Sequence, residues 1–230
     1  MAGIIPRING ASFGVYKAHL LEYEIGPCSY ENGYIVTAAS MIPVKLKYSL
    51  GVRDIELKID FEGETMHEIE QNISEFTELL HESAEVLLPD GFTYACYFQK
   101  ASTPTEKAPW ILQVKFTLEG YRHGAMETRT LEESGSVFVD GNYKTPAILK
   151  ISTSAASVKV FGITIGNISG EIVIDGYKKT VTETVNGIAS NKFADTDMTE
   201  FPKLKAGYNE IDIEADGDVT VELSYYPIYR

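Results

Sequence analysis

Histidine is the residue type in this 230-residue chain best suited to acid–base or metal chemistry near neutral pH, and it occurs four times. His19, His67, His81 and His123 form no HExxH pattern and show no ligand spacing with one another or with either cysteine. We therefore expect all four histidines to be exposed or to lie on polar faces, with no shared metal ion.

The two cysteines are too few for a disulfide framework, and neither belongs to a CxxC motif or a Cys/His cluster. We expect Cys28 and Cys96 to be reduced thiols. Cys96 falls on one face of a predicted strand with Phe92, Tyr94 and Phe98, where a free cysteine behaves as a small buried hydrophobic residue. A reactive thiol is the alternative.

Two groups of acidic residues resemble calcium ligands. Residues 195–200, with the sequence DTDMTE, begin like an EF-hand loop but lack its glycine at the sixth position and its glutamate at the twelfth. The second group alternates along one predicted strand and its turn: Asp212, Glu214, Asp216 and Asp218. Calcium is conceivable there, but a solvated acidic face is the favoured interpretation.

No enzyme motif accompanies these residues. The chain has no GxSxG, no GxGxxG and no P-loop, and no pair of carboxylates stands out as a glycosidase pair among its many acids. The sequence therefore predicts no catalytic, cofactor-binding or metal-binding residue, and it favours a protein that is not an enzyme.

The chain is acidic along its whole length. Its 20 basic and 33 acidic residues give a net charge of −13, with 10 basic and 17 acidic residues in 1–125 and 10 and 16 in 126–230. DNA affinity depends largely on Lys and Arg at phosphates, and the sequence shows no basic stripe of that kind. An acidic wall would repel passing DNA and suit a conduit, although the same charge also favours simple solubility.

Residues 1–7 lack the basic and apolar regions of a signal peptide, and no apolar run approaches the roughly 20 residues of a membrane helix. Synthesis and assembly in a cytoplasm are therefore the default expectation.

Turn signals and alternating patterns predict a mainly β chain. Asn-Gly and Asp-Gly pairs, which tolerate the positive φ of tight hairpins, occur at 9–10, 32–33, 90–91, 140–141, 175–176, 186–187 and 216–217. Apolar and polar residues alternate over 44–50, 55–61, 112–118 and 219–225. Each of these segments is predicted as a strand with one core face, and 51–54 as a hairpin loop between the first two.

One segment has helical periodicity instead. Its apolar residues recur at three- and four-residue spacing: Met66, Ile69, Ile73, Phe76 and Leu80. Thr65 followed by Glu68 makes a capping box at the start. We expect one amphipathic helix over about 65–81, packed on its own sheet; pairing with a partner helix is the alternative.

The chain is long enough for one large domain or two small sandwiches. Polar segment 127–136 follows a turn-rich stretch at 120–124, and strand patterning resumes at Val137. We therefore predict domains 1–126 and 137–230, joined by a linker at 127–136. Segments 26–33 and 99–110 lack periodicity and are predicted as loops of the kind that often form contact surfaces.

Short turn and strand elements follow one another in a specific order. In the first half they are Ile-Asn-Gly at 8–10, the hairpin and helix over 51–80, and Leu-Pro-Asp-Gly at 88–91. In the second half they are Pro-Ala-Ile-Leu at 146–149, Ile-Asp-Gly at 174–176, Asn-Gly at 186–187, Phe-Pro-x-Leu-x-x-Gly-x-Asn at 201–209 and Tyr-Pro at 226–227. This order and spacing resembles that of the distal tail protein family of long-tailed, siphovirus-type bacteriophages.

The resemblance implies two β-sandwich domains. The first would be a belt domain that forms a homo-hexameric ring at the distal end of the tail tube, and the second a galectin-like sandwich outside the ring. The implied partners are the tail tube protein, a tail-tip or tail-associated lysin protein, and baseplate or receptor-binding proteins. The implied location is the virion, after assembly in the host cytoplasm, with an axial channel for DNA, no specific nucleic-acid binding and no membrane insertion.

A carbohydrate-binding module that recognises the host cell wall is the alternative function. The only tryptophan, Trp110, lies in the first half, and no histidine follows His123, so a galectin-like fold alone does not carry sugar binding across. A tyrosine stacking surface is conceivable, although core or interface tyrosine is favoured. The tyrosines concerned are Tyr177, Tyr208, Tyr225, Tyr226 and Tyr229.

Overall fold

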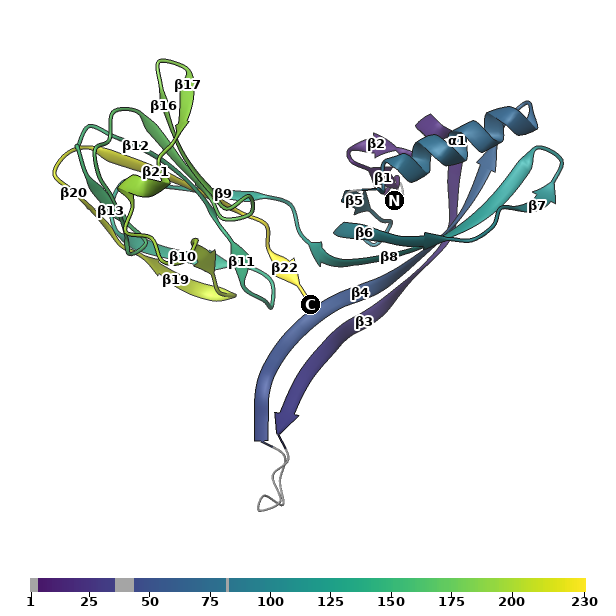
Figure 1. The fold of residues 1–230 in the computed structure, drawn as a ribbon, viewed down its shortest axis with the longest axis horizontal. Coiled ribbons are helices and arrows are strands. Elements are labelled where there is room, and N and C mark those ends of the chain that lie inside the picture. The colour runs from purple at the N-terminus through teal and green to yellow at the C-terminus, as the bar shows by residue number, and fades with distance from the viewer. Residues whose placement is uncertain (1–3, 36–43, 82) are drawn as a thin grey trace. The chain divides into compact units, whose positions relative to one another are not determined.

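The computed structural model describes residues 4–35, 44–81 and 83–230, and nearly all of its regular structure is antiparallel β-sheet (Figure 1). The chain divides into two compact units, one of residues 1–122 with Arg230 and one of residues 123–229. The described residues contain one α-helix, and it lies in the first unit. The prediction of a mainly β fold, with one helix in the first of two parts, is confirmed.

A single curled sheet forms most of unit 1. Its strands are β1 (Arg7–Ile8), β2 (Ala11–Ser12), β3 (Ala18–Ile35), β4 (Val44–Glu62), β5 (Ala84–Leu87), β6 (Thr93–Ala101), β7 (Thr105–Ala108) and β8 (Ile111–His123). Their order is β2-β1-β5-β6-β8-β4-β3, and β7 also pairs with β8. The buried faces of β4 and β8 carry the residues that the alternating pattern assigned to the core: Ile55, Leu57, Ile59, Phe61, Leu112, Val114, Phe116 and Leu118.

Strand β4 is continuous, so the predicted hairpin loop at 51–54 is wrong. Its neighbour β3 pairs along the whole length, from Ala18 opposite Phe61 to Ile35 opposite Val44. Gly51 allows β3 and β4 to approach closely and does not form a turn. A Cβ at this position would lie 1.9 Å from the Ser29 hydroxyl oxygen on β3. The side chains of 44–50 lie outside the described residues, so their predicted alternation is untested.

Both segments predicted as loops are largely strand. Segment 26–33 belongs to β3, which absorbs its irregularity in register shifts between Ile25 and Cys28 and again after Cys28. Segment 99–110 contains the end of β6 and all of β7, with Trp110 at a positive φ of 70° in the turn before β8. Pairing with β4 and with β8, respectively, overrides the weak local pattern of these segments.

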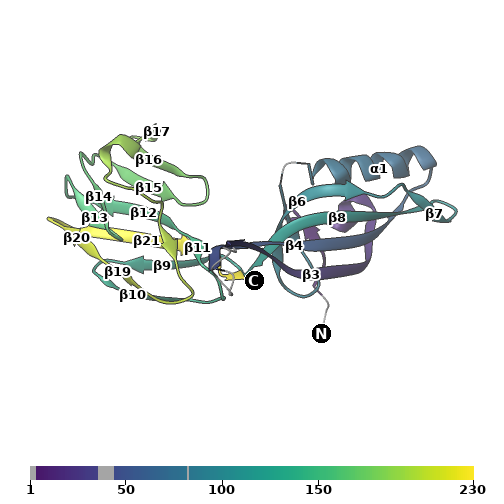
Figure 2. The same cartoon turned by 60° about the horizontal axis from the view of Figure 1, so that its bottom comes forward.

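Helix α1 (Met66–Glu78) begins as the sequence predicts and ends three residues before the predicted His81. The Thr65 side chain caps it by accepting a hydrogen bond from the Glu68 amide at 3.2 Å. The Glu68 carboxylate accepts in turn from the Glu64 amide, one residue before the residue that a capping box would use. Figure 2 shows the helix lying beside the sheet, running in much the same direction as β6 and β8.

The apolar stripe of α1 packs onto its own sheet, as predicted. Ile69, Phe76 and Leu80 are buried, and Ile73 packs against the same core, whereas Met66 is 38% exposed. The ring of Phe76 makes contacts at 5.0–5.5 Å with the rings of three other phenylalanines: Phe13, Phe61 and Phe116. These edge-to-face and tilted contacts form the centre of the core of unit 1.

Unit 2 is a β-sandwich (Figure 2). One sheet has the order β17-β16-β15-β12-β21-β9, and the facing layer is made of the pairs and triplet β10-β19, β11-β18 and β14-β13-β20. The strands are β9 (Glu127–Leu131), β10 (Gly135–Val139), β11 (Thr145–Pro146), β12 (Ile148–Thr153), β13 (Val158–Val160), β14 (Ile163–Ile165), β15 (Glu171–Asp175), β16 (Thr180–Val185), β17 (Ile188–Asn191), β18 (Lys203–Leu204), β19 (Gly207–Ile211), β20 (Ile213–Ala215), β21 (Val219–Tyr225) and β22 (Ile228–Tyr229).

The segment predicted as a linker, 127–136, is part of the sandwich. Within it, β9 pairs with β21 from Glu127 opposite Tyr225 to Leu131 opposite Val221, and β10 begins at Gly135. The compact units divide between Arg122 and His123, several residues earlier than predicted. The polar side chains of β9 are typical of a linker in the sequence. They occur in a strand because β9 is an edge strand with a solvent-exposed face, which needs few hydrophobic residues.

The Asn-Gly pairs in two of the two-residue hairpins behave as the sequence predicts. Asn9 and Gly10 join β1 to β2 with φ values of 49° and 83°, and Asn186 and Gly187 join β16 to β17 with 50° and 79°. The pair at 32–33 does not form a turn, because the backbone there continues along β3.

Candidate interaction surfaces

The acidic residues that resemble a calcium loop are occupied by other partners. The Asp195 carboxylate accepts hydrogen bonds from the Asn167 amide at 2.9 Å and is 3.2 Å from Lys192 Nζ. The Asp197 carboxylate accepts from the Thr164 backbone amide at 2.7 Å, and this contact lowers the pKa of the Asp197 carboxyl. Because these carboxylates bind other groups, their oxygens do not surround a common point where calcium could be coordinated.

The second acidic group is a solvated face, as favoured from the sequence. Glu214 on β20 is 64% exposed and lies 2.7 Å from Lys159 Nζ on the neighbouring strand β13. Within the parts of the chain that the structure describes, no three His, Cys, Asp or Glu side chains are grouped closely enough to hold a metal ion.

His123 differs from the other three histidines. His19, His67 and His81 are exposed, but His123 is only 5% exposed, so the prediction of an exposed or polar-face residue is wrong for it. Its ring packs edge-on against Tyr226 at 4.7 Å, and its Nδ1 lies 2.8 Å from the Gly124 carbonyl oxygen. His123 fills space at the start of unit 2.

Cys96 is a buried structural thiol, as its strand pattern predicts. Its side chain is 1% exposed, and burial raises the pKa of the Cys96 thiol to about 12. The thiol donates to the Tyr94 carbonyl oxygen at 3.3 Å. Cys28 is also free and buried, so neither thiol has the exposed, electropositive setting of a reactive cysteine.

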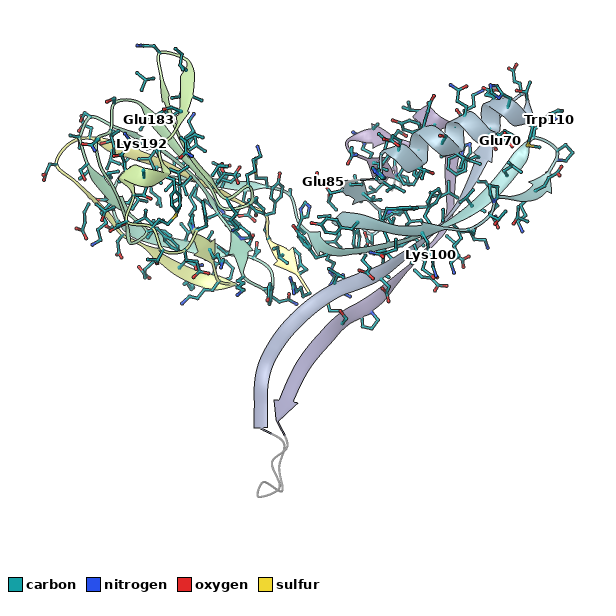
Figure 3. All side chains as sticks on the ribbon, viewed as in Figure 1. Glu70, Glu85, Lys100, Trp110, Glu183 and Lys192 are labelled. Carbon is teal, nitrogen blue, oxygen red and sulfur yellow. The ribbon has the colours of Figure 1, made fainter. Side chains whose placement is uncertain are left out.

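A buried ion pair in unit 2 was not predicted. Lys192 and Glu183 have side chains only 8% and 7% exposed, and they meet at 3.0 Å (Figure 3). The other Glu183 oxygen accepts from the Ser169 and Gly170 backbone amides, and Lys192 also donates to the Asn167 carbonyl oxygen at 2.6 Å. These amides and Lys192 lower the pKa of the Glu183 carboxyl, and Glu183 raises that of the Lys192 amine. The network ties the β14–β15 loop to the β16–β17 hairpin.

The five tyrosines considered for sugar stacking do not form one surface. Tyr225 is fully buried, and its hydroxyl donates to Glu127 at 2.9 Å and to the Phe138 carbonyl oxygen at 3.1 Å. The Tyr177 hydroxyl accepts from the Tyr226 backbone amide at 3.0 Å and contacts Thr145. These tyrosines hold the sandwich together.

Tyr208 is the exposed member of that set. It is 68% exposed and stands directly opposite Phe138 in the β10–β19 pair, with ring centroids 5.1 Å apart. The two rings border an open groove of about 400 Å³ that also receives Glu127, Arg129 and Asp140. This groove has the aromatic surface and polar rim that ligand sites often combine.

The outer face of the unit 1 sheet is charged. Lys58 on β4 lies 3.3 Å from Glu22 on β3, and Lys115 on β8 lies 2.6 Å from Glu56 on β4. The side chains of these pairs are 34–61% exposed. Such pairs contribute little stability in water, but they define a polar, patterned surface.

Several strands leave an edge without a partner strand among the described residues. In unit 1, β3 forms one end of the sheet, and it runs with β4 as a long two-stranded ribbon (Figure 1). In unit 2, β9 and the short, exposed β17 form the two ends of the larger sheet. Open edges present unpaired backbone groups that another chain can pair with or cover.

The described residues of the two β units thus carry exposed charged side chains and open strand edges. No protein-family model matches the chain, and no curated protein matches its sequence. No helix in the described part of the chain is both long and apolar enough to span a bilayer.

The fold is that of bacteriophage tail hub proteins. The crystal structure of the SPP1 Dit protein (gp 19.1), described as a paradigm of the hub adsorption apparatus in phages that infect Gram-positive bacteria, is similar with a TM-score of 0.69 and 14% identity. The similarity covers 96% of this chain and 98% of that one. The resemblance to distal tail proteins is therefore confirmed at the level of the fold.

Components of the phage P2 baseplate show the same similarity. In the activated conformation with calcium, one chain matches with a TM-score of 0.57 and 13% identity, over 94% of this chain and 92% of that chain. In the form with strontium the TM-score is 0.55 and the identity 12%, over 92% of each chain. The shared fold includes both units of the present chain.

Proposed function

We propose that this chain is a distal tail protein, a structural component of a phage tail tip and not an enzyme. The observation that carries the proposal is the match to a tail hub protein over nearly the full length of both chains, through both units. A shared fold alone does not fix function, but two different β units joined in the same order are a more specific likeness than one common sandwich.

Unit 1 would act as the belt domain of a homo-hexameric ring at the distal end of the tail tube. Cyclic assembly repeats one contact between neighbours and closes without free ends. The open edge of β3 and the patterned charges of the sheet face are features that ring closure would use or cover. The protein would act through the shape of the assembled ring and not through a chemical reaction.

The ring would connect the tail tube protein to the tail-tip or tail-associated lysin protein and to baseplate or receptor-binding proteins. Unit 2, the galectin-like sandwich, would face these outer components. The axial channel would pass DNA without holding it, because a net charge of −13 repels phosphates. The protein would be assembled in the host cytoplasm and reside in the virion, without membrane insertion or specific nucleic-acid binding.

Assembly state tests the proposal. Negative-stain microscopy and light scattering on the purified chain, alone and with the tail tube protein encoded beside it, should reveal sixfold rings with an open centre. Their mass should be about 150 kDa, six times the 25.5 kDa of one chain. A chain that stays monomeric even with the tube protein would contradict the proposal.

A carbohydrate-binding module remains the second candidate, and the groove beside Tyr208 and Phe138 is the observation that favours it. Binding to purified cell-wall glycan should then be lost in Tyr208→Ala, because the exposed ring would supply the stacking surface. Ile188→Ala, which also removes an exposed apolar side chain of unit 2, is the matched control. Unchanged glycan binding in Tyr208→Ala would exclude this groove.

A further inference from the structure

The charge of unit 2 is unevenly distributed. Residues 123–229 contain nine basic and sixteen acidic residues, a net charge of −7. Five of the nine basic residues are lysines in three short segments that are far apart in sequence: Lys144, Lys178, Lys179, Lys203 and Lys205. We call this group the lysine corner.

Backbone contacts bring the three segments together. Strand β11 pairs with β18 through Thr145 opposite Leu204, and continuing this register places Lys144 opposite Lys205. The turn that follows β15 is fixed to the same place, because the Gly176 amide donates to the Ala147 carbonyl oxygen at 2.9 Å. The Ala147 amide in turn donates to the Pro202 carbonyl oxygen at 3.0 Å.

Among the residues that the structure describes, two acids, Glu200 and Asp175, form ion pairs with these five lysines. Glu200 contacts Lys203, and its carboxyl has a lowered pKa, first through this hydrogen bond and further through the charges of Lys203, Lys144 and Lys179. Lys178 is 81% exposed and 3.9 Å from Asp175. Neither Lys144 nor Lys205, both exposed, has an ion pair with any carboxylate that the structure describes.

Several lysines elsewhere in the protein are arranged differently. Lys58, Lys150 and Lys159 each lie within 3.3 Å of a carboxylate on a neighbouring strand or segment. Like charges placed directly opposite each other on neighbouring strands are destabilising. A group of lysines with too few carboxylates is therefore a surface whose charge an external anion would balance.

The composition of the corner indicates the class of anion. Protein–protein interfaces are enriched in aromatic residues and Arg and depleted in Lys, so a lysine-only corner does not fit a protein partner well. Arginine forks suit fixed, bidentate geometry, whereas lysine acts as a mobile point charge that follows a flexible chain of phosphates.

A nucleic acid fits this surface less well than a simpler polyanion. Single-stranded nucleic acids need exposed rings on which their bases stack. The ring of Phe201, beside the corner, is half-buried, stacked on Phe193 with ring centroids 6.2 Å apart, and covered by Lys179 Nζ at 5.1 Å from its centroid. A DNA duplex is wide enough that its phosphates would also lie within a Debye length of the acidic residues elsewhere in unit 2, and these residues would repel it.

We propose that the lysine corner binds a flexible polyol-phosphate chain, the chemistry of anionic polymers on bacterial surfaces. Residues 203 and 205 lie on the same side of their strand segment, roughly 7 Å apart along it, a separation similar to that of successive phosphates in such a chain. The site lies within unit 2 and depends neither on ring formation nor on the groove beside Tyr208.

The test measures binding of poly(glycerol phosphate) to the full chain at 50 and 200 mM salt, with light scattering on the same sample to record assembly. The affinity should fall roughly 50-fold between these salt concentrations, because about four phosphates each contribute about 0.7 to the salt slope. K144Q/K203Q/K205Q should bind at least tenfold more weakly at 50 mM salt and show a salt slope smaller by about 2.

The matched control is K58Q/K150Q/K159Q, which removes the same charge from lysines that already have carboxylate partners. It should keep binding within about twofold of the unmodified chain, since none of its positions contributes to the corner. Equal losses in the two variants, or no binding by the unmodified chain, would overturn the proposal. Equal affinity for a 15-residue oligothymidylate would overturn the assignment to polyol phosphates.

Discussion

The two units bury different chemistry, although both are antiparallel β structures. The core of unit 1 is organised around aromatic rings, with Phe76 of α1 in contact with Phe13, Phe61 and Phe116. The buried residues at the core of unit 2 are aliphatic except for Tyr225, and the unit also buries an ion pair, Glu183–Lys192. We therefore expect the stability of unit 1 to depend most on the volume of its buried side chains, and that of unit 2 to depend most on its buried charges.

The largest expected effect is in unit 1. Phe76→Ala should lower the free energy of unfolding by about 3–5 kcal/mol, because it removes a fully buried ring and leaves a cavity among three others. Urea unfolding followed by fluorescence of Trp110, the only tryptophan, reports on this unit. Met66→Ala, at a 38% exposed position of the same helix, should cost less than about 1 kcal/mol. Equal effects would contradict a ring-centred core.

The next effect belongs to unit 2. Lys192→Met should lower its free energy of unfolding by about 1–3 kcal/mol, since Glu183, Asp195 and the Asn167 carbonyl oxygen lose a charged donor. Circular dichroism during urea unfolding measures the change. Lys150→Met, at an exposed pair on β12, is the control and should have a much smaller effect. A loss confined to the control would refute this role for Lys192.

Acid should affect unit 2 through the same network. The pKa values of Glu183 and Asp195 are lowered in the folded state, mainly by backbone amides for Glu183 and by the Asn167 amide for Asp195. Their contribution to stability is present above the ordinary values of 4.5 and 3.8, and it is lost as the pH falls through the lower folded values. Thermal midpoints at pH 7, 5, 4 and 3 should fall most steeply below about pH 4.5, and less steeply in Glu183→Gln. A parallel decline in both proteins would show that other carboxyls dominate.

The smallest effect is expected on the outer face of unit 1. Lys115→Gln removes the 2.6 Å contact with Glu56, but the Lys115 side chain is 53% exposed, and water replaces the lost partner. The thermal midpoint should change by no more than about 2 °C. A larger shift would mean that this face is a more cooperative charge network than its exposure suggests.

Local signals in the sequence predicted part of the fold well. The stripe of α1, its Thr65 cap and the hairpins at Asn9-Gly10 and Asn186-Gly187 each depend on residues close together in the chain. The sequence wrongly predicts a turn within β4. Gly51 favours a turn in the local pattern, and only the structure shows that it faces Ser29 on the neighbouring strand. The pattern of a single segment cannot show which partner strand it will meet.

The candidate surfaces were harder to predict, for the same reason. Lys192 and Glu183 are nine residues apart, yet nothing in either neighbourhood marks them as a buried pair until β16 and β17 are in place. The lysine corner is assembled from three segments, so counting charges by halves of the chain conceals it. Of the tyrosines, the pattern could not separate the exposed Tyr208 from the buried Tyr225.

The sheets of both units are completed by pairing strands that are far apart in the sequence, so folding of each unit depends on segments that are synthesised late. In unit 1, β1 pairs with β5 about 80 residues later, with Arg7 opposite Leu87. In unit 2, β21 lies between β12 and β9, so β9 has no partner strand, and β12 is paired only with β15, until residues 219–225 have been synthesised. Such non-local closure folds slowly. A nascent chain that terminates before β21 would leave two strand edges uncovered, so premature termination in its last dozen residues should yield aggregates and not a shortened functional protein.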